Sequence, residues 1–272
     1  MSKFKFLIFF TALNFVSIQG QEINGSIINS SNNTPVEFVN IGLFEKNIGT
    51  VSDIKGEFSL EVDFKFDKDS VLFSAIGYET KSIKISNLRN KKNNEILLKE
   101  KTYELKEIVI KPKEFKTKVL GIKSKIKTIS AGFKDNMLGY EMGVIMKIKK
   151  PAHIKQLNIN VANCTYDTIF YRLNFYKVTG KMQFENILSK PIYIEIPRNL
   201  TKDEIEIDLS SNNLVIDDDF LVTVENIKDL GKGHLNFCAK IGASTFYRKT
   251  SHGKWESVPA GVSISLVADV EK

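Results

Sequence analysis

The chain has 272 residues and a formal net charge of +7, and this length favours two domains over one or three. Its composition, 42% apolar and 26% charged, is that of a globular protein and excludes disordered, collagen-like and coiled-coil classes. Two Cys exclude a disulfide-dense scaffold and three His exclude a His-rich metal protein, whereas the positive charge raises a nucleic-acid or anionic-membrane hypothesis.

The N-terminus predicts a signal peptide over residues 1–20. Lys3 and Lys5 precede an apolar run at 6–16, and small and polar residues follow up to Gly20. The run is shorter than the roughly 20 residues that a membrane-spanning helix needs. Because there is no Cys near the cleavage point, we do not expect a lipoprotein. We therefore expect an exported protein of the periplasm or the outer-membrane surface, without a transmembrane segment in its mature chain.

Strand signals dominate the mature chain. Alternating apolar and polar residues, rich in β-branched and aromatic types, recur about every ten residues between turn-forming residues. No window has a sustained helical period, so we expect an all-β protein built of sandwiches. The expected strands are 22–28, 36–44, 57–62, 71–75, 81–85, 140–148, 154–161, 168–178, 192–196, 204–209, 220–224, 235–241 and 262–267.

A Lys-rich stretch at 99–127 predicts the domain boundary, with one domain at 21–112 and the other at 113–272. It holds ten Lys and four Glu, so most of the net charge lies in this join. It would suit an anionic lipid or an envelope glycan, but its few aromatic residues argue against nucleic acid. We favour a solvated face, with Lys123–Lys127 alternating as a strand that lysines protect from edge pairing.

Two turns organise the first domain. Asp53–Gly56 predicts a tight turn in which the aspartate caps backbone amides and the glycine takes a positive φ. Gly77 predicts a bend before Tyr78, which would cover a sandwich edge.

Residues 22–110 resemble the carboxypeptidase-regulatory-like domain. The resemblance rests on the runs Gly25-Ser26-Ile27-Ile28, Val39-Asn40-Ile41-Gly42-Leu43, Gly49 to Leu60, Leu72 to Thr80, Ile96-Leu97-Leu98 and Leu105 to Ile110. It implies a seven-stranded prealbumin- or immunoglobulin-like sandwich. The family occurs beside zinc carboxypeptidase domains and at the N-terminus of TonB-dependent receptors in Bacteroidetes.

Those neighbouring domains are not expected here. The 162 residues that follow position 110 cannot form a receptor barrel. His153, His234 and His252 do not belong to a zinc-ligand pair such as His-x-x-Glu, so the resemblance does not imply peptidase activity. The second domain weakly resembles the larger jelly-roll-like antiparallel sandwich that is often attached to this module.

Searches for catalytic and metal-binding motifs favour structural interpretations. The chain has neither a Gly-x-Ser-x-Gly nucleophile elbow nor a glycine-rich phosphate loop. Asp217–Asp219 is either a calcium ligand set or a solvated turn, and we favour the turn because adjacent side chains point in different directions. Glu204, Glu206 and Asp208 share a strand face that would suit a pair of hydrolase carboxylates but is more simply the solvent side.

The two cysteines leave a similar choice. Cys164 and Cys238 could form a disulfide in an exported protein, but we favour free thiols that pack as small apolar side chains. A catalytic Cys164 is disfavoured because nothing near it in the sequence would lower its pKa. We therefore expect no catalytic residue, no metal and no cofactor.

The best binding candidates are Trp255, Tyr247 and Arg248. An exposed ring in the polar loop 251–256 could stack on a sugar or anchor a partner with Arg248; alternatively, Trp255 packs over the sandwich edge. The leading hypothesis is a non-catalytic cell-envelope protein that binds a glycan, a peptide or an envelope protein. The alternatives are an accessory subunit of an outer-membrane uptake or secretion system, and a glycan-active hydrolase.

Overall fold

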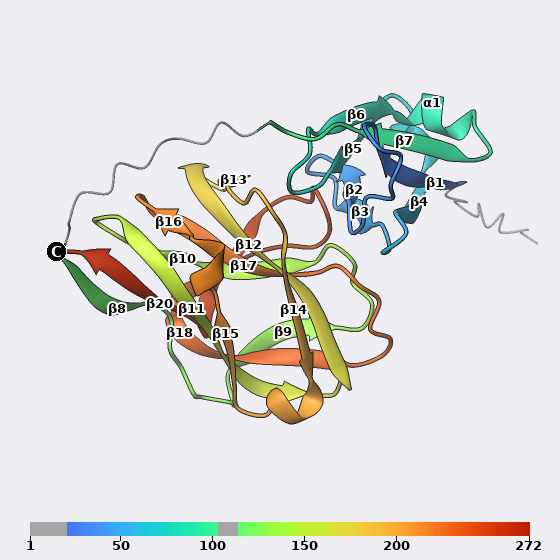
Figure 1. Cartoon of the computed structure of the whole chain (residues 1–272). Coiled ribbons are helices and arrows are strands. Elements are labelled where there is room, and N and C mark those ends of the chain that lie inside the picture. The colour runs from blue at the N-terminus through green and yellow to red at the C-terminus, as the bar shows by residue number, and fades with distance from the viewer. Residues whose placement is uncertain (1–20, 103–113) are drawn as a thin grey trace, which may run out of the picture.

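The strands of a computed structural model form two bodies that lie side by side (Figure 1). The structure describes residues 21–102 and 114–272. The first sandwich comprises 21–102 and the second sandwich 114–272. The all-β expectation is confirmed. The predicted signal peptide, the run 105–110 and the boundary at 112–113 lie outside the described residues. In the described ranges, no helix has both the length and the hydropathy needed to cross a bilayer.

The first sandwich pairs a three-stranded sheet with a four-stranded sheet. In the smaller sheet the central strand runs antiparallel to one neighbour and parallel to the other. Alternate residues of both sheets point inward, as the period of two requires, and Ile27, Leu60 and Phe73 lie in the shared core. The sheets are β4 (Glu57–Val62), β1 (Gln21–Asn29), β7 (Asn94–Leu98), and β3 (Ile48–Val51), β2 (Asn40–Leu43), β5 (Ser70–Ser74), β6 (Lys81–Lys84), with one short helix α1 (Ile85–Arg89).

The two turns expected from the sequence are present in the first sandwich. Asp53 Oδ1 accepts hydrogen bonds from the amides of Lys55 and Glu57, both at 2.8 Å, and Gly56 has a φ of 73°. Gly77 has a φ of 91°. Each of these glycines takes a backbone conformation that other residues adopt only with strain.

The second sandwich is one hydrogen-bonded network of thirteen strands. Residues 234–238 of its longest strand pair with β9 and β11, while 246–248 pair with β10. That strand therefore passes from one layer to the other around a core rich in Phe and Ile. The strands are β8 (Phe115–Gly121), β9 (Ser130–Lys134), β10 (Glu141–Met146), β11 (Ala152–Cys164), β12 (Thr168–Gly180), β13 (Gln183–Asn186), β14 (Ile192–Pro197), β15 (Glu204–Asp208), β16 (Val215–Ile216), β17 (Phe220–Asn226), β18 (His234–Arg248), β19 (Glu256–Val262) and β20 (Ile264–Glu271).

Three strand predictions were wrong, one entirely and two in part. Lys123–Lys127 is not a strand, because Ser124 is buried and hydrogen bonds Ala239 O and Ser263 Oγ instead of a neighbouring ladder. The strand expected at 36–44 begins only at Asn40, since Phe38 has a φ of 50°. The strand expected at 262–267 is two, separated at Ser263.

Candidate functional site at the junction of the sandwiches

A row of four charged side chains crosses the second sandwich where the first sandwich covers it. Strand register places Arg172 of β12 beside Glu225 of β17, Glu225 beside Glu141 of β10, and Glu141 beside Arg248 of β18. We call these four residues the charged row. Each is at most 8% exposed, so this face of the sheet is buried although it carries charge.

The charged row is paired within itself. Arg172 donates from Nε and Nη2 to Glu225 Oε2 at 3.1 and 2.9 Å. Arg248 donates from Nε to Glu141 Oε2 at 2.7 Å, and its Nη2 lies 3.7 Å from Glu225 Oε1. Buried charges persist in proteins when they are paired in this way.

Neutral side chains complete the hydrogen bonding of the two carboxylates. Asn174 Nδ2 donates to Glu141 Oε1 at 2.9 Å and to Glu225 Oε2 at 2.8 Å. Tyr176 donates its hydroxyl to Glu141 Oε1 at 2.9 Å, and Thr223 donates to the same oxygen. Glu225 Oε1 is the one buried oxygen of the pair without a hydrogen bond.

The environment separates the pKa values of the two carboxyls. Burial raises the pKa of Glu141, and the charge of Arg248 offsets only part of this effect. Burial would also raise the pKa of Glu225, but the charges of Arg172 and Arg248 outweigh it and lower that pKa. Such divergence is typical of acid–base pairs in active sites and also of structural ion-pair networks.

The first sandwich is bonded directly to this face. Arg172 Nη1 donates to Phe38 O at 2.7 Å, and its Nη2 donates to Asn40 Oδ1. From the other side, His252 Nε2 lies 3.3 Å from Asn40 O and 3.2 Å from Ser74 Oγ. Burial and the charge of Arg248 lower the pKa of His252 to about 4, so its ring is neutral at pH 7.

A polar cleft of about 350 Å³ opens beside the charged row between the two sandwiches. Its walls come from the 74–80 segment of the first sandwich and from β12, β13 and the 248–252 segment of the second. Arg172 and Arg248 reach the cleft, whereas Glu141 and Glu225 lie behind them. The side chains that the cleft presents include Asn40, Ser74, Tyr78, Thr80, Asn174, Tyr176, Phe184 and Asn186.

The structure brings together two of the three predicted binding residues. The guanidinium of Arg248 lies 5.1 Å from the ring centroid of Trp255. Trp255 is half-buried and makes edge contacts with Phe184 at 5.1 Å and Tyr176 at 5.9 Å. Tyr247 lies apart from them, because it precedes Arg248 on β18 and points to the opposite face, where its hydroxyl donates to Glu256.

The other candidates lie away from the cleft. Cys164 and Cys238 are free thiols. Ile205 is buried on β15 while Glu206 is exposed, so the acidic face of that strand is the solvent side. Within 21–102 and 114–272, no cluster of three His, Cys, Asp or Glu residues could hold a metal ion. Asp219 instead accepts a hydrogen bond from the amide of Ile148.

Sequence reasoning missed Glu141, Arg172, Glu225 and Asn40. The one signal in the sequence was a charged residue within the expected strands 140–148 and 168–178 and directly after the expected strand 220–224. On a strand, such a residue normally marks the solvent face, and the sequence does not show that another sandwich covers that face.

Comparisons with known proteins support the family resemblance of the first sandwich and add little about the second. Residues 23–110 match the family model described as CarboxypepD_reg-like domain. No curated protein matches the chain.

Among solved structures, a chain from the structure of infectious bursal disease virus Gt strain matches at 9% identity and a TM-score of 0.20. The match covers 92% of this chain and 64% of the viral chain. The VP2 subviral particle of that virus matches at 9% identity and a TM-score of 0.17, over 86% and 60%. The chain thus spans less than two thirds of these viral chains, and TM-scores this low support no conclusion about fold or function.

Proposed function

We propose that this protein is an exported, non-catalytic cell-envelope protein that binds a neutral glycan in the polar cleft. The carrying observation is the composition of the cleft, which combines amides, hydroxyls and an aromatic ring around a floor of paired charges. The family match of the first sandwich and the predicted signal peptide support an envelope setting of the Bacteroidetes type. We interpret the second sandwich as jelly-roll-like.

The charge balance of the floor favours a neutral ligand. Arg172 and Arg248 each bond a glutamate, so neither carries an uncompensated charge that would select an anion. The other charged residues that line the cleft, Lys101 and Glu185, have opposite signs. The side-chain amide of Asn40 and the hydroxyls of Ser74 and Thr80 suit the hydroxyl groups of a sugar, which both donate and accept hydrogen bonds. A volume of about 350 Å³ lies at the small end of ligand pockets, which suits a short glycan segment.

The aromatic wall supports the same ligand class. Phe184 lines the cleft, and Trp255 and Phe246 hold its ring from behind with centroid distances of 5.1 and 5.9 Å. A ring fixed in this way offers a flat apolar surface at little entropic cost. Trp255 would therefore act by positioning Phe184 and Arg248.

The enclosure of the two carboxylates supports binding rather than hydrolysis. A glycosidase needs its acid and its nucleophile or base to flank the substrate bond. Glu141 and Glu225 are fully buried, and side chains of the charged row and its neighbours stand between them and the cleft. Their role in the proposal is to hold Arg172 and Arg248 in place.

A glycan and peptide array probed with the whole chain tests this proposal. Wild type should bind neutral glycans, and Phe184→Ala should weaken binding about tenfold, as expected for a lost aromatic contact. Trp255→Ala should weaken it less. Phe115→Ala is the matched control, because Phe115 is 41% exposed on β8 and should not affect binding. Binding of peptides alone, or equal signals from wild type and Phe184→Ala, would refute the proposal.

A further inference from the structure

We propose that a second groove at the junction docks a protein partner through an extended segment with a large apolar residue flanked by Lys or Arg. This acidic groove has a volume of about 670 Å³ and is lined by the 51–59 segment of the first sandwich and by parts of β12, β14 and the 227–229 segment of the second. It does not share a lining residue with the polar cleft.

The floor of the acidic groove is apolar and preformed. Phe38, Val51 and Ile227 are buried there and form a small core of their own, separate from the cores of the two sandwiches. Phe38 lies 5.4 Å from the ring of Phe170 and 5.4 Å from that of Tyr193. Because both sandwiches contribute to this floor, it exists only when they are docked.

One apolar side chain at the edge of the groove is left in water. Ile54 is 66% exposed at the tip of the Asp53–Gly56 turn, although it lines the groove. Next to a concave apolar floor, an exposed isoleucine extends the apolar surface that a partner would bury. Contiguous apolar patches of this kind mark interaction sites.

The rim is acidic on a molecule that is basic as a whole. Four exposed carboxylates line the groove against a single lysine, whereas the net charge of the chain is +7. None of the four forms an ion pair with another described residue. Such a rim attracts cations and repels nucleic acid and anionic lipid. The carboxylates are those of Asp53, Glu57, Glu195 and Asp229.

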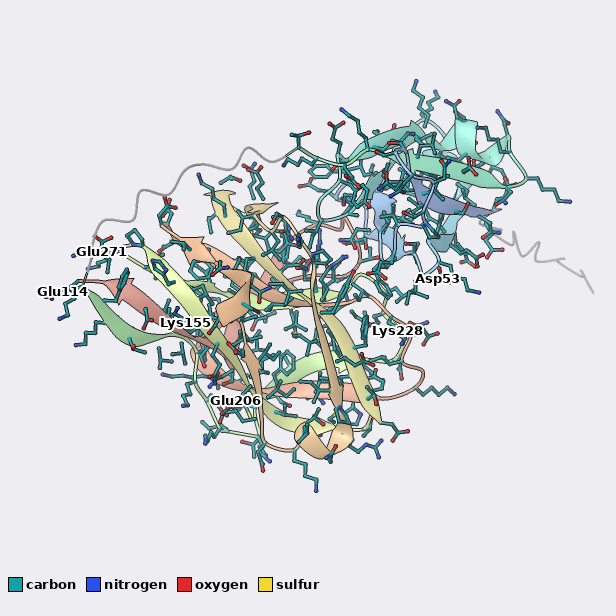
Figure 2. The ribbon with its side chains drawn as sticks, in the orientation of Figure 1. Asp53, Glu114, Lys155, Glu206, Lys228 and Glu271 are labelled. Carbon is teal, nitrogen blue, oxygen red and sulfur yellow. The ribbon has the colours of Figure 1, made fainter. Side chains whose placement is uncertain are left out.

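The single lysine shows how a cation fits the groove. Lys228 Nζ lies 5.1 Å from the ring centroid of Phe170, within the range of a cation–π contact. In Figure 2, the labels of Asp53 and Lys228 mark the facing edges of the two sandwiches. A partner's Lys or Arg would find carboxylates on both edges of the groove, while its apolar residue fills the floor.

The occupant we infer is therefore a basic and apolar segment of another protein. The carboxylates on both edges of the groove would repel an acidic segment. The apolar floor disfavours a segment that carries only basic residues. A second copy of this chain is the competing occupant, since its own strand β8 carries Lys and exposed apolar residues.

Fluorescence anisotropy with three labelled peptides and the whole chain tests the docking proposal. The peptide Lys-Lys-Leu-Phe-Lys-Lys should bind, and more weakly as salt is raised, because exposed charges are screened. Its acidic counterpart Glu-Glu-Leu-Phe-Glu-Glu and the polar Lys-Lys-Ser-Ser-Lys-Lys should bind much less. Equal binding of all three peptides would overturn the proposal.

Paired variants locate the binding. Glu57→Gln with Glu195→Gln should weaken binding of the basic peptide about fivefold, as expected for two lost exposed ion pairs, and Ile54→Ser should weaken it without changing the salt dependence. Glu61→Gln with Glu206→Gln is the matched control, since both are exposed glutamates outside the groove. An equal loss in the control pair would overturn the assignment.

Two further measurements separate this proposal from its rivals. Sedimentation of wild type should show a monomer; a dimer that dissociates in the Glu57→Gln and Glu195→Gln variant would assign the groove to a second copy and overturn the proposal. Phe184→Ala should bind the basic peptide as wild type does, so failure of the glycan site and failure of the docking groove are distinguishable. Thermal melts should confirm that each variant is folded.

Discussion

At the residue scale, the charged row fixes how the two sandwiches dock more than it stabilises the fold. Removing two guanidinium groups and two carboxylates from water costs several kcal/mol per ion, which close pairing only roughly offsets. The charged row allows the first sandwich to dock in only one position. Arg172 bonds Glu225 on its own sheet and also Phe38 and Asn40 on the first sandwich. A shifted docking would leave these buried groups unpaired.

The first prediction concerns Arg172. Arg172→Met should lower the free energy of unfolding by about 3–5 kcal/mol, because it leaves the carboxylate of Glu225 buried with less compensation. Adding Glu225→Gln should restore part of that loss, since the uncompensated charge is then removed. Urea unfolding followed by the fluorescence of Trp255, the single tryptophan, measures both values.

Arg198→Met provides the control for this cycle. Arg198 pairs with Asp167 and donates to the backbone oxygens of Thr165 and Tyr166, but its side chain is 51% exposed, so the loss should stay at about 1–2 kcal/mol. If Arg172→Met cost no more than Arg198→Met, the charged row would not hold the junction.

At the element scale, the hairpin of β2 and β3 presents bare backbone to the second sandwich. Gly42 and Gly49 are cross-strand partners. A Cβ added to either would come within 2.3 or 2.5 Å of Ser251 O. The two glycines therefore let the 249–253 segment lie flat on this hairpin, which places His252 against Asn40.

The second prediction follows from this close approach. Gly42→Ala should destabilise the protein by about 1–3 kcal/mol, the usual cost of overpacking, and should make the junction more accessible to protease. Differential scanning fluorimetry and limited proteolysis measure the two effects. In the control Gly180→Ala, the nearest atoms belong to the flexible end of Gln183 and can move aside. An unchanged melting temperature in Gly42→Ala would contradict the inferred fit.

Strands were predictable where one face is buried by the same sandwich. The expected strand 57–62 has the observed bounds, because Phe58, Leu60 and Val62 alternate with polar residues. The prediction failed where contacts come from distant segments. Phe38 takes its unusual backbone conformation beside Phe170 and Tyr193, and Ser124 hydrogen bonds Ala239 and Ser263, which are more than a hundred residues away. Neither contact leaves a periodic pattern in the local sequence.

The candidate site was less predictable than the fold for the same reason. Arg248 and Trp255 could be chosen because they are close in sequence and chemically suited to binding. Glu141, Arg172 and Glu225 become neighbours only through the register of three strands. When two residues of opposite charge are far apart in the sequence, the sequence alone does not show that they form an ion pair.

At the scale of the whole molecule, the buried junction should make the two sandwiches unfold as one unit at neutral pH. Acid should weaken this coupling through His252, whose pKa in the folded protein is about 4, whereas an unfolded histidine titrates near 6.5. Between these values the unfolded state binds more protons than the folded state. The stability contributed by neutral His252 is therefore present above pH 6.5 and is lost as the pH falls toward 4.

The third prediction is a change in the shape of the thermal transition. Scanning calorimetry should give one transition at pH 7 and a lower, split transition near pH 4.5. His252→Asn should show a smaller drop between these pH values, and Asn tolerates the φ of 58° at this position. Glu141 and Glu225 titrate in both proteins, so the difference isolates His252. An identical drop in the variant would exclude His252 as the acid-sensitive group.

The junction also sets an order of events during synthesis. Asn40 and His252, which meet across it, are 212 residues apart in the chain. The first sandwich is therefore synthesised with Phe38 and Val51 uncovered, and they remain so until Phe170, Tyr193 and Ile227 of the second sandwich have followed. A truncation before residue 170 would leave this apolar surface open, so synthesis of the second sandwich is the step that protects the first from aggregation.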